Sequence, residues 1–447
     1  MKVGRRLRRI GRVLAYVLVF MPLVIAVLVV SSPLILRHMV NNRIAEIKAR
    51  GEPITPSDLA GPKIPDSENG AVIYQKIFDR LEEPRFSNDR EVLADFLSRK
   101  ERAENPKLWD DTRDVIARYE WALPMVKTAA SKPKCRFSVD WNAPPMEIKF
   151  PHLRKIMFLS YLTGAHAMIE AKEGNIGGAN ESIELGIRLG QSLKDEPHFL
   201  SQLSRLHVIN TPLRILSDSL GYRAMDEDEA RHLSNLLASI ELRDGLRLGM
   251  ISERALWSKQ FELLRTEPIK SSDGSRDREP GPFWIAFTYA NELHYQNVMN
   301  DCISSAKLPY RQAKPRFGTS DTRFPFLVSG ILLPNFPPVH WDRAMAKVAG
   351  SQILLALHVH RNKYGSYPET LADLGKRLGW EIPTDPFSGK AFVYQRTGEG
   401  FVLYSIGPNL RDDGGLSEEE IERKHQLLTP PRPPKPENYD IVWTMDH

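Results

Sequence analysis

The sequence lacks the short motifs by which common catalytic sites are recognised. It has no G-x-S-x-G, H-E-x-x-H or G-x-x-x-x-G-K-[ST] run, which would indicate a serine nucleophile, a zinc pair or a phosphate-binding loop. His358 and His360 are two positions apart in a predicted helix, so they point to different faces and do not match the spacing of a helical metal pair. Sites can also be assembled from distant residues, but we do not expect an enzyme.

Cysteine is almost absent, since only Cys135 and Cys302 occur in 447 residues. In an oxidising compartment the two could form one disulfide. The alternative is that both are unpaired small apolar residues, because they lie far apart in the sequence and in different predicted elements. The sequence leaves both arrangements open.

Basic residues are concentrated at the N-terminus and are balanced by acids elsewhere. The formal net charge is +5, but six basic residues lie in the first twelve positions: Lys2, Arg5, Arg6, Arg8, Arg9 and Arg12. Without this cluster the remainder of the chain is close to neutral. Nucleic-acid binding requires a basic face on a folded domain, so we expect no nucleic-acid partner.

One long apolar run follows the basic cluster. Residues 13–36 read VLAYVLVFMPLVIAVLVVSSPLIL and contain no charged residue. About 20 helical residues cross the hydrocarbon layer of a membrane, so the run predicts a transmembrane helix with Pro33 near its end. A cleaved signal peptide is the alternative, although its apolar region is usually about 7–15 residues long and precedes a small-residue cleavage site.

The charges that flank this run predict its orientation. The more positive flank stays in the cytoplasm, and the cluster in residues 1–12 is denser than the positive group that follows the run. We therefore expect a basic cytoplasmic segment at 1–12, a polar stalk at 37–67 and an extracytoplasmic location for the bulk of the chain. This topology describes a single-pass protein of a bacterial inner membrane, with the membrane as one partner.

Residues 68–303 have the apolar spacing of helices, and we expect them to form an α-helical domain. Within it, residues 150–193 contain two helical stretches around the turn EGNIGG, with small residues near the turn and larger ones further away. This pattern resembles one tetratricopeptide-type hairpin. Repeat arrays need about three units for stability, so an ordinary helical hairpin is the alternative.

Residues 304–341 form a proline-rich connector after the helical domain. Its apolar stretch, FPFLVSGILLPNF at 324–336, is too short to span a bilayer. Two interpretations remain open for this stretch, a buried connector and a segment in contact with a membrane surface.

Residues 342–447 have a different pattern from the helical domain. A stretch with helical spacing comes first, and β-branched and aromatic residues are then frequent in three short segments: 391–396, 401–407 and 439–443. Three strands packed on a helix make a viable small sheet. The predicted fold is therefore mainly α, with an N-terminal transmembrane helix, an α-helical domain and a small C-terminal α+β module that contains a three-stranded antiparallel sheet.

Four motifs follow one another in this last region: YGSYPETLADL, DPFSGKAFVYQ, YSIGPNLRDDGG and YDIVW. Their order resembles the globular part of the major pseudopilins of type II secretion systems, which have Y-x-x-x-x-G-x-Y-P, D-P-W-G-x-P-x-x-Y, S-x-G-A-D-G with G-G, and D-I-x-x-W. The positions that correspond are Asp385, Pro386, Phe387, Gly389, Tyr394, Ser405, Gly407, Gly414, Gly415, Asp440, Ile441 and Trp443. The resemblance covers about 100 of 447 residues, and similar tails follow helical regions in bacterial membrane-anchored proteins.

The resemblance implies a calcium site in the acidic loop. In the pseudopilins this loop holds a calcium ion between the hairpin and the last strand, and such an ion takes six to eight oxygen ligands. The candidate ligands are Ser405, Asn409, Asp412, Asp413 and Asp440. Asn409 and Leu410 stand where the family has aspartate and glycine, so a solvated acidic turn is the alternative.

The N-terminus departs from the resemblance. Pseudopilins polymerise through an N-terminal helix that contains a glutamate, whereas the run at 13–36 has none and precedes the pseudopilin-like helix by about 300 residues. We therefore expect a borrowed module rather than a filament subunit. The predicted function is binding or scaffolding at the bacterial envelope, with envelope or secretion proteins as partners. The alternative is an envelope hydrolase that cleaves a cell-surface polymer in a cleft of the helical domain.

Overall fold

A computed structural model describes residues 31–222, 225–268, 277–317, 339–416 and 440–445. Residues 31–49 are helical, and the short 3-10 helix η1 (Pro56–Leu59) follows them. The next helices are α2 (Gly70–Phe78), α3 (Arg85–Leu97), α4 (Arg99–Glu104), α5 (Leu108–Tyr119), α6 (Ala122–Ala130), α7 (Pro151–Lys172), α8 (Ile176–Gln191) and α9 (Phe199–Ser219), with η2 (Pro145–Glu147) before α7.

The second half of the described chain contains η3 (Leu220–Tyr222), α10 (Glu227–Ala238), α11 (Arg243–Thr266), α12 (Pro282–Ser305), α13 (Tyr310–Phe317), α14 (Val339–Tyr364) and α15 (Leu371–Leu378). Three strands complete it: β1 (Val393–Thr397), β2 (Gly400–Ser405) and β3 (Ile441–Met445). They form an antiparallel sheet in the order β1-β2-β3. The described chain is therefore mainly helical, with one small sheet.

The prediction of an N-terminal transmembrane helix is wrong. Within the ranges given above, no helix is long and apolar enough to cross a membrane. Residues 31–36, the end of the predicted span, belong to a helix that continues to residue 49 through the charged side chains of Arg37, Arg43 and Glu46, which are costly in hydrocarbon. Residues 1–12 and 13–30, like the connector stretch 324–336, lie outside the described residues.

The helical hairpin predicted at 150–193 is formed by α7 and α8, and α9 packs against both. Glycines let these three helices approach closely. A Cβ on Gly186 would lie 3.2 Å from Cβ of Pro212 in α9, and a Cβ on Gly190 would collide with the side chain of Ile209. Larger residues at these two positions would force α8 and α9 apart, so the small residues near the helix crossing determine the spacing of the central helices.

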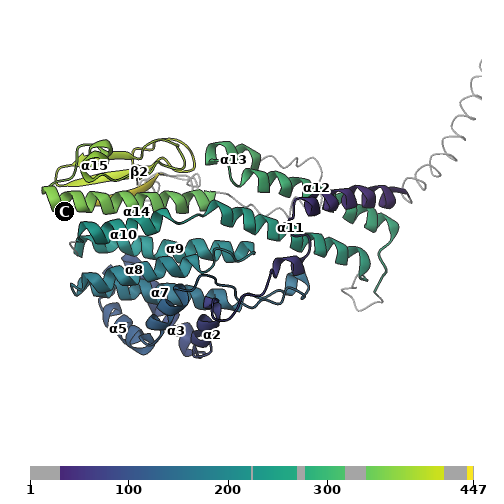
Figure 1. Ribbon diagram of the computed structural model, residues 1–447, viewed down its shortest axis with the longest axis horizontal. Helices are drawn as coiled ribbons and strands as arrows, with labels where there is room; N and C mark the ends of the chain where they lie inside the picture. Colours follow the sequence, from purple (N-terminus) through teal and green to yellow (C-terminus); the bar gives the residue numbers. More distant parts are fainter. Residues whose placement is uncertain (1–30, 223–224, 269–276, 318–338, 417–439, 446–447) are drawn as a thin grey trace, which may run out of the picture.

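The elements are stacked in layers, as Figure 1 shows. The sheet and α15 cover one side of α14, and α10 and α9 pack against α14 from the opposite side. The α7–α8 hairpin lies next to α9, and α3 and α5 form the outer layer beyond α7. One cluster of buried side chains runs from Phe96 in α3 through Leu162 in α7 to Leu355 in α14 and Leu403 in β2. The C-terminal sheet and the helical region therefore share a continuous core.

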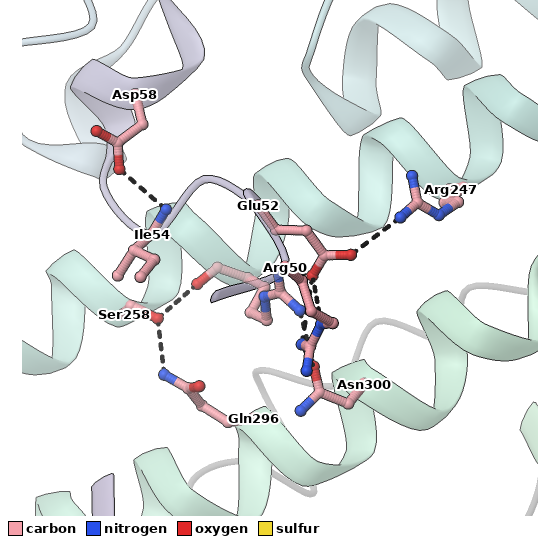
Figure 2. Close-up of polar contacts among 9 residues, drawn as sticks. Arg50, Glu52, Ile54, Asp58, Arg247, Ser258, Gln296 and Asn300 are labelled. Carbon is pink, nitrogen blue, oxygen red and sulfur yellow. Dashed lines mark hydrogen bonds and ion pairs between the residues drawn. The ribbon is translucent and has the colours of Figure 1, made fainter. Parts of the chain in front are cut away.

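An ion-pair network around the buried Arg254 ties the segment after residue 49 to α11 and α12. Oε2 of Glu52 accepts a hydrogen bond from Nη2 of Arg254 at 2.8 Å, and Oε1 accepts one from Nη2 of Arg247 at 2.9 Å. Nη1 of Arg254 also donates to Oδ1 of Asn300 in α12 at 2.7 Å. Figure 2 shows Glu52 between Arg247 and Arg50, with Asn300 on the neighbouring helix. Arg254 is only 1% exposed, so Glu52 supplies the charge that permits its burial.

Candidate functional site

The acidic loop predicted to hold calcium is organised by hydrogen bonds within the protein. The hydroxyl of Ser405 donates to Oδ1 of the buried Asp385 at 2.7 Å, so this candidate ligand faces the 385–388 turn. Nδ2 of Asn409 donates to Oδ2 of Asp413 at 2.6 Å, and the hydroxyl of Tyr404 donates to Oδ1 of Asp412 at 2.9 Å. Each of these oxygens already has a protein donor.

Asp440 is the acceptor at the centre of the loop. Its Oδ2 accepts hydrogen bonds from the backbone N–H groups of Asp413 at 3.1 Å and Gly415 at 2.9 Å. Its Oδ1 is buried and has no hydrogen-bond partner among the described residues. Burial and the neighbouring charges of Asp413 and Asp412 raise the pKa of Asp440 to about 6, even though the two backbone hydrogen bonds favour ionisation.

The loop places the backbone of Asp413 against Asp440 and turns Ser405 toward Asp385. The described part of the chain has no group of three or more His, Cys, Asp or Glu side chains arranged to hold a metal ion. The calcium site stays a prediction from the resemblance, with the bare Oδ1 of Asp440 as the structural feature in its favour.

The histidine pair and the two cysteines form neither a metal pair nor a disulfide in the structure. His358 and His360 are both buried in α14; Nε2 of His358 accepts a hydrogen bond from the backbone N–H of Met225, and Nδ1 of His360 lies 2.8 Å from the carbonyl of Ser366. Both cysteines are free, and burial raises the pKa of both thiols, to about 12 for Cys302. The disulfide that the sequence left open is absent from the structure.

A different site is formed where the helical region meets the C-terminal sheet. A cavity of about 700 Å³ lies between α3, α7, α9, α14 and β3. This volume is typical of ligand pockets. Leu97, Leu213 and the β3 residues Ile441, Val442 and Trp443 form its apolar wall. The cavity therefore joins the outer layer of helices to the edge of the sheet.

The rest of the cavity wall is strongly cationic. Arg99, Lys100, Arg214 and Lys347 line it, and Asp218 is the only carboxylate among its lining residues. Asp218 is already engaged on both oxygens, because Arg99 contacts Oδ1 and Nη2 of Arg102 lies 2.9 Å from Oδ2. The residues that line the cavity therefore carry more positive than negative charge, which an anionic ligand would complement.

Two titratable side chains form a hydrogen bond inside this cavity. The hydroxyl of Tyr161 lies 2.8 Å from Nε2 of His207. Desolvation and the charges of Arg214 and Lys347 lower the pKa of His207, and burial raises the pKa of Tyr161. Both groups are therefore neutral near pH 7, so neither of them offsets the positive charge of the wall.

A cluster of four titratable side chains lies where α7, α9 and α11 meet. Nε2 of His152 lies 2.7 Å from Oε1 of Glu196, and Nε2 of His198 lies 3.9 Å from Oε1 of Glu253. The cavity beside His152 has a volume of only about 60 Å³, which is well below the volume of typical ligand pockets.

The cationic residues of the large cavity carry no signal in the sequence. They come from α4, α9 and α14, and more than 100 residues separate Lys100 from Arg214 and Arg214 from Lys347 along the chain. No short motif joins them, so only the packing of α9 and α14 brings them together. Comparison with protein-family models, curated proteins and solved structures gives no significant match.

Proposed function

We propose that this protein is a binding protein and that its ligand is an acidic polypeptide segment held in the cavity between α9, α14 and β3. The observation that carries the proposal is the cationic and apolar lining of that cavity. Lys100 and Arg214 suit carboxylates, and the side chains of β3 suit apolar residues of the same ligand.

The position of β3 favours a polypeptide over a small anion. In the order β1-β2-β3, this strand pairs with β2 on one side and lies at an edge of the described sheet. An edge strand presents backbone N–H and C=O groups to which an extended peptide can add as a further strand. Because Ile441, Val442 and Trp443 also line the cavity, a peptide paired with β3 would lie beside the basic residues.

This proposal narrows the predicted binding or scaffold role to peptide binding. This cavity gives the hydrolase alternative no support, because its one lining carboxylate, Asp218, is engaged by Arg99 and Arg102. The link to the bacterial envelope and to secretion proteins stays a prediction from the resemblance of residues 342–447 to pseudopilins.

The test is a binding titration of the full-length chain with a fluorescent peptide of alternating glutamate and valine. A peptide with glutamine in place of glutamate serves as the ligand control. We expect Arg214→Gln and Lys100→Gln to weaken binding of the acidic peptide by about tenfold each, since a charge-assisted contact contributes about 1.5–3 kcal/mol. Lys376→Gln, an exposed charge on α15, should leave the affinity unchanged.

Two results would overturn the proposal. One is equal affinity for the glutamate and glutamine peptides, because the cationic wall would then have no role. The other is unchanged binding by the Arg214→Gln and Lys100→Gln variants, because the peptide would then bind elsewhere. A far-ultraviolet circular dichroism spectrum of each variant would establish that the helices are intact.

A further inference from the structure

Exposed apolar side chains gather at one end of the molecule. Phe283, at the start of α12, is 72% exposed, and Leu34, in the helix at 31–49, is 67% exposed. Ile35 and Met39 in the same helix are exposed as well. These four residues are half of the eight large exposed hydrophobic residues in the described ranges. Isolated exposed apolar residues need no explanation, but a group of them marks an interaction surface.

The two segments lie side by side. Nη2 of Arg43 donates to Oδ1 of Asn297 in α12 at 2.7 Å, and Nη2 of Arg50 donates to Oδ1 of Asn300 at 3.3 Å. The two helices therefore run in the same direction, and their first turns lie at the same end. Figure 1 shows the helix at 31–49, in purple, beside α12 at the end of the molecule away from the sheet. We call this surface, formed by Leu34, Ile35, Met39 and Phe283, the apolar tip.

The apolar tip is backed by aromatic side chains in fixed positions. The rings of Phe283 and Phe287 are stacked with centroids 6.5 Å apart, and the ring of Trp284 lies 5.7 Å from that of Phe287. Nε1 of Trp284 donates to the carbonyl of Leu264 at 2.8 Å, which attaches the start of α12 to the end of α11. Aromatic side chains with one apolar and one polar end are enriched at membrane–water interfaces.

Charge near the apolar tip also suits a lipid surface. Residues 31–42 contain no aspartate or glutamate, and Arg37 lies among their exposed apolar residues, whereas the exposed residues Asp277, Arg278 and Glu279 precede α12. Positive charge beside apolar side chains favours anionic headgroups. The chain also enters the described structure at this end, directly after residues 13–30, which contain no charged residue.

We propose that the apolar tip docks on an anionic lipid surface, with Phe283, Leu34 and Ile35 inserted among the headgroups and acyl chains. The contact is made by side chains at the end of two helices and requires no segment to cross the bilayer. It leaves the cavity lined by α9, α14 and β3 available to a peptide. The proposal is independent of the peptide-binding function, because it rests on different residues.

The experiment measures whether the tip itself touches lipid. Phe283→Cys and Ile35→Cys variants of the full-length chain are labelled with a fluorophore and mixed with vesicles of phosphatidylcholine and phosphatidylglycerol that carry a nitroxide on the acyl chain. The native thiols should not compete for the label, because burial raises the pKa of Cys135 and Cys302. Tyr364→Cys is the matched control, an exposed aromatic position at the end of α14.

We expect the labels at positions 283 and 35 to lose most of their fluorescence and the label at position 364 to lose none. Equal quenching at all three positions, or none at 283 and 35, would overturn the proposal. If the label at position 283 instead becomes shielded from solvent as the protein concentration rises, with or without lipid, the tip binds a second copy of the chain.

Discussion

The indole of Trp443 in β3 lies directly against the backbone of Gly350 in α14. A Cβ added at Gly350 would overlap the ring of this tryptophan, although the glycine itself lies within a regular helix. The absence of a side chain on α14 is therefore what allows the sheet to approach the helix closely. Because Trp443 also lines the cavity, this contact determines one wall of the proposed binding site.

Gly350→Ala should destabilise the protein by about 1–3 kcal/mol, because it overpacks the contact between the helix and the sheet. Chemical denaturation of the full-length chain measures this change. The matched control is Gly177→Ala in α8, where a new Cβ has no close neighbour and higher helix propensity should add about 0.5–1 kcal/mol of stability. If Gly350→Ala also stabilises the protein, the sheet does not rest on α14 as described.

Glu52→Gln should destabilise the protein by about 3 kcal/mol or more, because it leaves the buried guanidinium of Arg254 without its counter-charge. Burial opposes ionisation of the Glu52 carboxyl. The hydrogen bond and charge of Arg254, together with the charges of Arg50 and Arg247, outweigh burial and lower the pKa of Glu52. The control is Glu46→Gln, which removes an exposed pair with Arg43 and should change the free energy of unfolding by less than about 0.5 kcal/mol. Equal effects of the two variants would contradict the structural role of the network.

The buried Glu253 should make stability fall as pH rises. Desolvation raises its pKa from 4.5 to about 7, against a hydrogen bond from Trp257. The folded state therefore favours the protonated carboxyl, and this contribution is complete below pH 4.5 and lost as pH rises through 7. Glu253→Gln should be more stable than the unmodified protein at pH 8 by up to about 3 kcal/mol and should match it near pH 4. Thermal unfolding across this range provides the check, and parallel curves would contradict it.

His198 should have the opposite effect on the acid side. Desolvation and the charge of His152 lower its pKa from 6.5 to about 4, so the folded state favours the neutral imidazole. Stability from this group is complete above pH 6.5 and is lost as pH falls through 4. A His198→Asn variant should lose less stability than the unmodified protein between pH 6.5 and pH 4. Nuclear magnetic resonance titration of the imidazole would measure the pKa directly, and a value near 6.5 would contradict the prediction.

Calcium should raise the melting temperature of the full-length chain if the acidic loop binds it as the resemblance implies. The ion would neutralise the repulsion among Asp412, Asp413 and Asp440, which contributes to the raised pKa of Asp440. Asp440→Asn should abolish the calcium effect, and magnesium should not reproduce it, because magnesium demands a tighter octahedral site. An unchanged melting temperature after addition of calcium and after chelation would identify the loop as an acidic turn.

Local structure could be read from the sequence where neighbouring residues decide it. Asp226 begins the acidic run 226–229 and caps α10 by accepting a hydrogen bond from the backbone N–H of Glu229. The β-branched and aromatic segments at 391–396 and 401–407 form β1 and β2, with a glycine-rich turn between them. Caps and tight turns depend on a few adjacent residues, so they need no information from the rest of the fold.

The sequence by itself determined the mainly helical character, the α7–α8 hairpin and the three short strands, because apolar periodicity and turn residues are local properties. Only the tertiary structure decided that α9 and α14 place Arg214 and Lys347 in one cavity with β3, and that Leu34 and Phe283 lie at one end of the molecule. These residues are brought together by the packing of a shared core, and the burial of apolar surface specifies that packing without a short motif in the chain.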